Sequence, residues 1–356
     1  MNLNINGYNI FAIVITTFII SLILVPIVKN IATHIGAIDG LKRRKNEIHP
    51  HHIHKKPIPR MGGLAIFLAF LAGYIFYAPS STQMLSVVIG GFIIVLTGII
   101  DDINPLKARY KLLSQILVAC IAVFYGGLVL TDFTVFGVLF EFVAPANYIF
   151  TILFIVGIMN AINIIDGLDG LAAGVSSIYF LTIGIIAIIL NQLGGLDIVL
   201  TFIMLGATLG FLIYNFNPAS IFMGDTGSFF LGFIISVIAL LGFRTATITS
   251  LIIPFLILAI PIFDTLLAII RRLIKGESIG KPDKEHFHHQ FLRMKFSPKK
   301  TVFIIYGINI LFAAISIFYV LERNRLAIFI YAILMIILFF FVLKTNILFN
   351  QKAKKK

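Results

Sequence analysis

Acidic and amide side chains interrupt a strongly apolar sequence, and their spacing points to chemistry. Asn160, Asn163, Asp166 and Asp169 recur every three residues between two apolar runs. If the segment is helical, this spacing places all four along one face. A charge inside a membrane costs about 3 kcal/mol or more, so it persists where it is paired, hydrated or used. Helix capping is the alternative interpretation, but caps do not require four polar groups in register.

Two further carboxylate clusters carry the same kinds of side chain. Asp101 and Asp102 are adjacent, and neighbouring carboxylates repel unless a cation or a shared proton intervenes. Asp225 lies between Gly224 and Gly227, in a predicted tight loop whose backbone N–H groups could bind an anion at a helix start. Hard cations such as Mg²⁺ take carboxylate, amide and phosphate oxygens. Both clusters therefore favour magnesium or phosphate handling, with a solvated helix end and a simple N-cap as the alternatives.

Three histidines, His286, His288 and His289, form the remaining cluster. A zinc site needs its ligands in a fixed geometry, and the other polar residues here are Asp and Asn. Imidazoles near a phosphate can instead donate hydrogen bonds or move protons near neutral pH. The sequence contains neither a Walker A pattern nor Gly-x-Gly-x-x-Gly. Metal-assisted phosphoryl transfer is the reaction class that these residues fit best.

The elements that must position these clusters are membrane helices. The 356 residues are 59% hydrophobic and 12% charged, roughly half the charge of a soluble domain. A span needs about 20 apolar residues. Eleven candidates run over 8–29, 61–78, 84–100, 112–130, 147–165, 171–190, 198–214, 229–243, 248–270, 301–321 and 326–344. We expect an all-α polytopic membrane protein of about eleven transmembrane helices, forming one integral-membrane domain over residues 1–356. The single cysteine, Cys120, excludes disulfides and Cys-based metal sites.

The basic residues predict the orientation. Nearly all Lys and Arg fall in 29–60, 107–111, 271–300 and 344–356. Alternating spans place these segments on one side, and the positive-inside rule makes that side cytoplasmic. The N-terminus is then outside, and the basic tail 345–356 is cytoplasmic, near anionic lipid rather than nucleic acid. Every polar cluster falls at a cytoplasmic span end, so we expect one site on that face. An ion-coupled transporter, the rival from another class, would place its polar groups near the midplane.

Five motifs in order resemble those of a known family. They are KKPIPRMGG, DDINPLKARYKLLSQ, NAINIIDGLDGLAAG, FLIYNFNPASIFMGDTGSFFLG and DKEHFHHQFL, covering about 55–292. Together they resemble the polyprenyl-phosphate N-acetylhexosamine-1-phosphate transferases, of glycosyltransferase 4 type. The muramoyl-pentapeptide branch has Pro-Thr-Met-Gly-Gly and three contiguous His. This chain has PRMGG at 59–63 and His-Phe-His-His, which resembles the bacterial GlcNAc-1-phosphate transferases.

The resemblance implies an activity and a location. A sugar-1-phosphate, GlcNAc-1-phosphate before other N-acetylhexosamines, would pass from its UDP-sugar to undecaprenyl phosphate with release of UMP. This step would start a cell-wall or surface glycan such as teichoic acid or O-antigen. The implied cofactor is Mg²⁺, with Mn²⁺ as an alternative, and the protein would be multi-pass in the bacterial cell membrane, with a homodimer suggested. The muramoyl-pentapeptide reaction is the alternative. Direct displacement is favoured over a covalent aspartyl intermediate, since Asp need only orient and deprotonate.

The resemblance also implies roles for individual residues. Asp225 and Asn163 would hold the metal ion, and Asp101 and Asp102 would be catalytic. The substrate contacts would be Lys55, Arg60, Lys111, Asp166, Asp169, Asn215, Phe222, His286, His288 and His289. The chain departs from the muramoyl branch after the Asp pair, where Asn104-Pro105 replaces a Lys.

Overall fold

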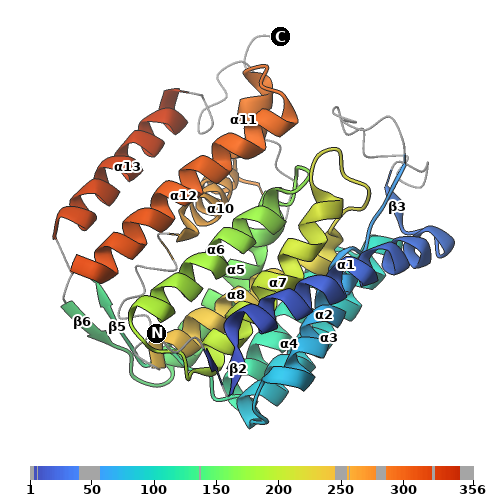
Figure 1. Ribbon diagram of the computed structural model, residues 1–356. Coiled ribbons are helices and arrows are strands. Elements are labelled where there is room, and N and C mark those ends of the chain that lie inside the picture. Colours follow the sequence, from blue (N-terminus) through green and yellow to red (C-terminus); the bar gives the residue numbers. More distant parts are fainter. Residues whose placement is uncertain are drawn as a thin grey trace, which may run out of the picture.

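A computed structural model describes residues 4–5, 7–39, 57–135, 138–244, 255, 257–277, 286–322 and 325–344. Helices dominate these residues (Figure 1). The helices are α1 (Ile10–His34), α2 (Gly63–Tyr77), α3 (Thr82–Ile103), α4 (Ala108–Cys120) with the π-helical turn η1 (Ile121–Tyr125), α5 (Ala146–Ile165), α6 (Leu171–Ile189), α7 (Leu196–Asn215), α8 (Gly224–Arg244), α10 (Ala259–Ile274), α11 (Phe287–Arg293), α12 (Pro298–Glu322) and α13 (Arg325–Lys344).

Three short antiparallel pairs of strands accompany the helices. They are β1 (Asn4–Ile5) with β2 (Tyr8–Asn9), β3 (Ile38–Asp39) with β4 (Ile58–Pro59), and β5 (Asp132–Val135) with β6 (Val138–Glu141). Each pair joins segments that are close in sequence. The strands therefore tie loops together at the helix ends and form no larger sheet among the described residues.

The predicted fold class is confirmed. Among the described residues, eight helical segments are long and apolar enough to cross a membrane: Ile10–His34, Thr82–Ile103, Ala108–Tyr125, Ala146–Ile165, Leu171–Ile189, Leu196–Asn215, Gly224–Gly242 and Pro298–Leu321. The count of eleven spans and their orientation stay predictions. Part of the ninth predicted span and the basic tail 345–356 lie outside the described residues.

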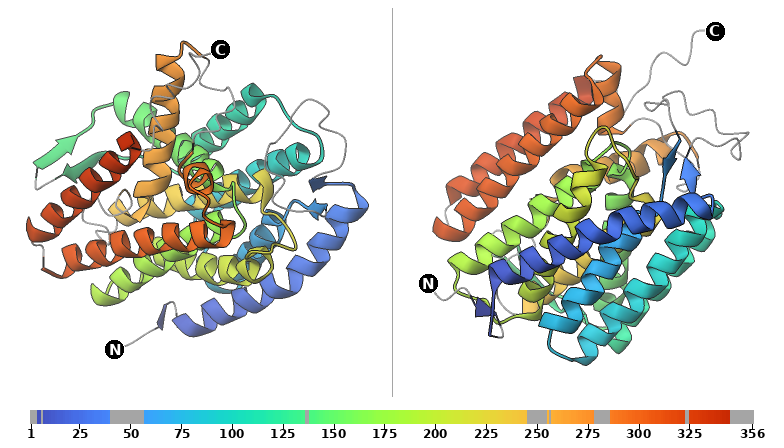
Figure 2. Two further views of the ribbon diagram at one scale, coloured as in Figure 1. Left: turned by 90° about the horizontal axis from the view of Figure 1, so that it is seen from above. Right: turned by 45° about the vertical axis from the view of Figure 1, so that its right-hand side comes forward.

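Helix α8 lies at the centre of the bundle and is its most deeply buried span. It packs against α3 and α5, while α1 packs against α7. Figure 2 shows α1 at one edge of the bundle and α12 and α13 at the opposite edge. The rings of Phe67 and Phe70 meet the ring of Phe230 edge-on, at centroid distances of 5.2 and 5.3 Å. This aromatic cluster joins α2 to α8 in the core.

Glycines let α2 and α3 approach the first turn of α8 at backbone distance. A Cβ atom on Gly63 would lie 2.0 Å from the Cα of Gly227, and one on Gly98 would lie 2.3 Å from the Cα of Thr226. Any side chain at these positions would separate the helices. The contact brings the last turn of α3 and the first turn of α8 together, where the carboxylates lie.

Loops collect at two opposite ends of the bundle. At one end, the Phe222 N–H donates to the Pro59 carbonyl (2.8 Å) and the Gly62 N–H donates to the Phe222 carbonyl (2.9 Å). At the other end, the rings of Tyr8 and Tyr77 meet at 5.0 Å. The polar clusters of the sequence all belong to the first end, as the alternation of spans predicts.

Candidate active site

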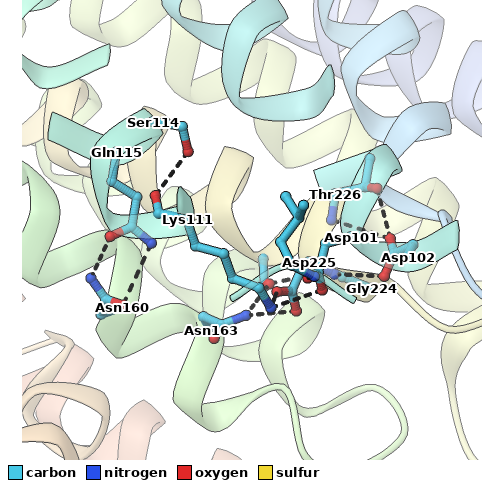
Figure 3. A network of polar contacts seen from close by, with 12 residues as sticks. Asp101, Asp102, Lys111, Ser114, Gln115, Asn160, Asn163, Gly224, Asp225 and Thr226 are labelled. Carbon is cyan, nitrogen blue, oxygen red and sulfur yellow. Dashed lines mark hydrogen bonds and ion pairs between the residues drawn. The ribbon is translucent and has the colours of Figure 1, made fainter. Parts of the chain in front are cut away.

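Lys111 lies between two carboxylates from different helices. Its Nζ is 2.8 Å from Asp101 Oδ2 and 2.6 Å from Asp225 Oδ2 (Figure 3). Asp101 is on the last turn of α3, Lys111 on the first turn of α4 and Asp225 on the first turn of α8. The Asp101 side chain is 2% exposed, whereas Lys111 and Asp225 are 25% and 20% exposed. One face of this triad is therefore open to a ligand.

Asp102 has a different environment from its neighbour. Its Oδ1 accepts from the Asp225 N–H (3.1 Å), and its Oδ2 accepts from the Thr226 N–H (3.3 Å) and hydroxyl (2.7 Å). Asp102 thus accepts from the free N–H groups at the start of α8. An N-cap residue does the same for its own helix, whereas Asp102 does so from α3. Gly224 has φ +71°, and a Cβ there would lie 2.2 Å from Asp102 Oδ2. The predicted tight turn before α8 is thus built around Asp102.

Asn163 extends the network into α5. Its Nδ2 donates to Asp225 Oδ1 (3.1 Å) and to Ser228 Oγ (2.8 Å). One turn earlier, Asn160 Nδ2 donates to Gln115 Oε1 (2.8 Å) on α4. Figure 3 shows both amides facing α4 and α8. The structure therefore brings Asn163 to Asp225, the pair that the sequence assigned to a metal ion.

Of the four residues predicted to share one helix face, only Asn160 and Asn163 are on a helix. Asn160 and Asn163 are on α5, but α5 ends at Ile165 and its C-cap Asp166 has ψ 40°, outside the helical range. Asp169 lies in the connection to α6, where its Oδ2 accepts from Asn217 Nδ2 (2.9 Å) and from the Ala219 N–H (3.0 Å). Asp169 therefore joins two loops, and the four residues share a site without sharing a helix.

Asp166 and Arg60 lie in loops outside the spans, and their surroundings shift the pKa of each side chain. Loss of hydration, together with the Asp225 and Asp102 carboxylates, raises the pKa of Asp166 well above its usual range. For Arg60, burial opposes the charged form, but Asp39 and the site carboxylates outweigh it and raise the pKa. Arg60 also pairs with Asp39 at 2.9 Å. Arg60 thus adds a fixed positive charge beside the acidic site.

Two predicted substrate contacts have backbone partners. The Asn215 amide accepts from the Gly170 N–H (3.0 Å) and donates to the Ile221 carbonyl (2.9 Å), so it links two loops of the site. The Phe222 backbone bonds to Pro59 and Gly62, while its ring is partly exposed. Lys55 lies outside the described residues.

The histidines lie over the α5–α6 connection. His286 precedes α11, and His288 and His289 are on it. A Cβ on Gly167 would lie 2.4 Å from His288 Nε2, so this ring rests on the Gly167 backbone. Burial, aided by the neighbouring His289 and His286, lowers the pKa of His288 well below its usual range. His288 is therefore a neutral ring at pH 7, packed on the Gly167 backbone.

The donor set suits a hard cation. The described residues contain no group of three or more His, Cys, Asp or Glu that could hold a metal ion, so an ion bound here would take further ligands from water or substrate oxygens. Mg²⁺ is typically held by one or two carboxylates together with waters and substrate phosphates. Asp225 and Asp101 provide two carboxylates at one point, and Asn163 meets Asp225 there through its amide nitrogen. The residues therefore fit a magnesium ion that also binds a phosphate.

Sequence reasoning missed three partners of the site. Ser228 and Gln115 bond to the two asparagines, and Asp264 of α10 bonds to His286. Asp264 had a signal, since it is the one carboxylate in the apolar stretch LIIPFLILAIPIFDTLLAII. Gln115 also had one, since it is a polar residue inside the span predicted over 112–130. Ser228 had none, because it follows Asp225 in a polar turn.

The fold and the site together define a multi-pass membrane protein with a carboxylate, amide and histidine site at one end of its helices. Residues 84–243 match the family model described as Glycosyl transferase family 4. A relative from Bacillus subtilis (strain 168) is 42% identical over 349 residues, which are 96% of this chain and 94% of the relative. The chain belongs to glycosyl transferase family 4, and it is a transferase of the bacterial cell membrane.

The relatives share a description of their activity. The Bacillus protein is a "probable undecaprenyl-phosphate N-acetylglucosaminyl 1-phosphate transferase". A decaprenyl-phosphate N-acetylglucosaminephosphotransferase of Mycobacterium tuberculosis is 34% identical, covering 82% of this chain and 78% of its own length. An undecaprenyl-phosphate alpha-N-acetylglucosaminyl 1-phosphate transferase of Thermotoga maritima is 29% identical over 90% of this chain and 94% of its own length.

Proposed function

We propose that this protein transfers GlcNAc-1-phosphate from UDP-GlcNAc to undecaprenyl phosphate and releases UMP. The observation that carries the proposal is a polar network at the ends of four helices. In it Lys111 pairs with Asp101 and Asp225, and Asn163 donates to Asp225. The relatives' names support GlcNAc-1-phosphate as the transferred group and give no support to the muramoyl-pentapeptide alternative. The product would start a surface glycan such as teichoic acid or O-antigen.

The proposed reaction exchanges one phosphorus–oxygen bond for another. An oxygen of the lipid phosphate attacks the sugar-bearing phosphorus, and the bond from that phosphorus to the UMP oxygen breaks. Both reactants are anionic and repel each other. Lys111 offsets that repulsion and, with the neutral amide of Asn163, helps to hold the reacting groups in line. A magnesium ion held by Asp225 and Asn163 would neutralise charge on the diphosphate of the donor and on the UMP that leaves.

The two adjacent aspartates have separate tasks in this proposal. Asp101 is buried, with its Oδ1 accepting from the Leu106 N–H (2.7 Å) and its Oδ2 paired with Lys111, so it would orient Lys111 toward the lipid phosphate. Asp102 has its oxygens occupied by the start of α8. Asp102 would then act by holding Asp225 in place. A direct displacement needs no covalent bond to either residue.

A transport function has no comparable support. Transporters bind ions near the bilayer midplane, at breaks within their helices. Here the charged network lies on the terminal turns of α3, α4 and α8. No observation favours a second candidate function.

The test is UMP release by purified protein in detergent with undecaprenyl phosphate, Mg²⁺ and either UDP-GlcNAc or UDP-MurNAc-pentapeptide. UMP from UDP-GlcNAc alone, abolished by EDTA and by Asp225→Ala, is the expected result. UMP from the pentapeptide substrate alone would contradict the proposed donor. Magnesium-independent UMP release would contradict the proposed metal ion while leaving the transferase activity in place.

A further inference from the structure

Asp264 is a buried carboxylate that the proposed reaction does not use directly. It is on α10 and is 1% exposed. Its Oδ1 is 3.3 Å from His286 Nδ1, and both of its oxygens are 3.3 Å from the Phe287 backbone nitrogen. A carboxylate in an apolar bundle is costly unless its partners compensate. Its partners are His286 and Phe287, the first residues of the histidine tract 286–289. The contacts that compensate the buried carboxylate therefore lie next to the active site.

The contacts of Asp264 bear on which ring nitrogen of His286 carries a proton. The Phe287 N–H donates to the carboxylate, whose oxygens therefore act as acceptors. When the carboxylate is ionised, Nδ1 is the donor of this pair, because an ionised carboxylate has no proton to give. The proton position on a histidine is set by such a partner. In the neutral ring, Nε2 is left as a free proton acceptor.

The same contacts hold α11 in position. The Phe287 N–H is one of the unpaired donors at the start of α11, and Asp264 satisfies it from another helix. One residue further, the His288 ring rests against Gly167, beside Asp166. The rings of His286 and His288 are nearly parallel, at 13° and a centroid distance of 5.9 Å. A shift of His286 would therefore move the whole tract over the α5–α6 connection.

We propose that Asp264 is a positioning residue that fixes the ring orientation and tautomer of His286 and anchors the histidine tract over the site. Its part in catalysis rests on the proposed transferase function, whereas its effect on the His286 tautomer does not. Groups that orient an active-site ligand in this way change rates without touching the substrate.

The kinetic test uses Asp264→Asn, His286→Gln and the double variant, in the UMP release assay with UDP-GlcNAc. Asparagine keeps the shape of Asp264 but removes its charge and opposes the Phe287 N–H with a second donor. Each single variant should lower kcat/KM by about 10- to 100-fold. The double variant should lose little more than His286→Gln alone, since both changes remove one interaction. Thr265→Val is the matched control: its hydroxyl bonds within α10, to the Pro261 carbonyl.

The spectroscopic test uses ¹⁵N-histidine-labelled protein, with the His286 signals assigned by their loss in His286→Gln. In the wild type Nδ1 should carry a proton, and Asp264→Asn should remove the preference for that form. A purely structural carboxylate would leave the tautomer unchanged.

The two proposals fail in different ways. An active wild type with Asp264→Asn at wild-type kcat/KM, or with costs that multiply in the double variant, would overturn the role of Asp264. A wild type that releases no UMP would overturn the proposed function, and the tautomer would still test Asp264. If Asp264→Asn does not fold, a wild-type His286 without a proton on Nδ1 would overturn the inference, and one with it would support it.

Discussion

Asp101 and Asp102 are neighbours in sequence but contact different elements. Successive residues of a helix point about 100° apart, so one side chain reaches Lys111 while the other reaches the start of α8. The pattern Asp-Asp predicts a shared cation, but in the structure Lys111 is in direct contact with Asp101 and not with Asp102. Residue type thus indicated the chemistry, while the direction of each side chain decides which element of the site it supports.

The charge balance of the triad makes a prediction for Lys111→Met. Without the ammonium group, Asp101 and Asp225 repel each other, and the free energy of unfolding should fall by about 2 kcal/mol. That is less than for a fully buried pair, because Lys111 is 25% exposed.

Millimolar Mg²⁺ should raise the melting temperature of this variant more than that of the wild type. Circular dichroism would measure both, with the exposed Lys107→Met as control. No rise in melting temperature with Mg²⁺ in any of the three proteins would contradict a metal site at the triad.

The raised pKa of Asp166 makes stability depend on pH. The folded protein keeps a proton on Asp166 that the unfolded chain loses above about pH 4. Stability therefore falls as the pH rises from there through the raised pKa. Asp166→Asn removes this loss, so it should raise the melting temperature by about 2 °C or more at pH 8 and little at pH 4. The exposed Asp132→Asn should show no such difference. A gain from Asp166→Asn that is equal at both pH values would refute the assignment.

Residue types predicted most of the residues of the site. Contacts between residues far apart in the chain could not be predicted from the sequence. Spacing and the family resemblance together indicated Asp225, Asn163 and the histidines, and the structure brings them to one end of the bundle. The pairing of Asp264 with His286 depends on which faces of α10 and α11 meet. A single sequence contains no signal for that contact, because apolar helices carry little information about their neighbours.

At the scale of the elements, helix ends were the least predictable feature. The third span was expected to end at residue 100, but α3 continues to Ile103 and carries both aspartates on its last turn. The eighth was expected from residue 229, whereas α8 begins at Gly224 and includes Asp225. Hydropathy locates the part of a helix that lies in lipid. Polar residues of the terminal turns continue the helix beyond it, and here they form the site.

The close approach of α3 to α8 makes a prediction for Gly98→Ala. The new Cβ would lie 2.3 Å from the Thr226 Cα, so the two helices must separate at the point that holds Asp102 against α8. The free energy of unfolding should fall by about 1–3 kcal/mol, and UMP release should fall with it. Gly157→Ala on α5 is the matched control, since nothing lies within 4 Å of its Cβ position. Gly157→Ala should have wild-type activity; equal losses in both variants would contradict the packing argument.

At the scale of the whole molecule, the basic segments and the polar network are independent signals that agree. Lys and Arg alone assigned the loops to two sides, and the structure gathers the terminal turns of α3, α4, α5 and α8 at one end. That end carries the described basic residues Lys107, Arg109 and Lys111. A transferase whose donor is a nucleotide sugar must face the compartment that holds nucleotides. The predicted orientation meets that requirement.

Cysteine labelling in intact cells would test this orientation. In a Cys120→Ala background, a membrane-impermeant maleimide should label Ser80→Cys and Gly194→Cys, which lie in exposed loops at the end away from the site. Lys107→Cys and Met294→Cys, exposed at the site end, should be labelled only after the cells are permeabilised. The reverse pattern would place the carboxylates outside, where the proposed donor UDP-GlcNAc does not reach them. Labelling of one residue from each pair in intact cells would contradict the alternation of spans. Because the positions flank α2, α3, α4, α6, α7 and α11, agreement of all four would establish the side of the network directly, without any assumption about the substrate.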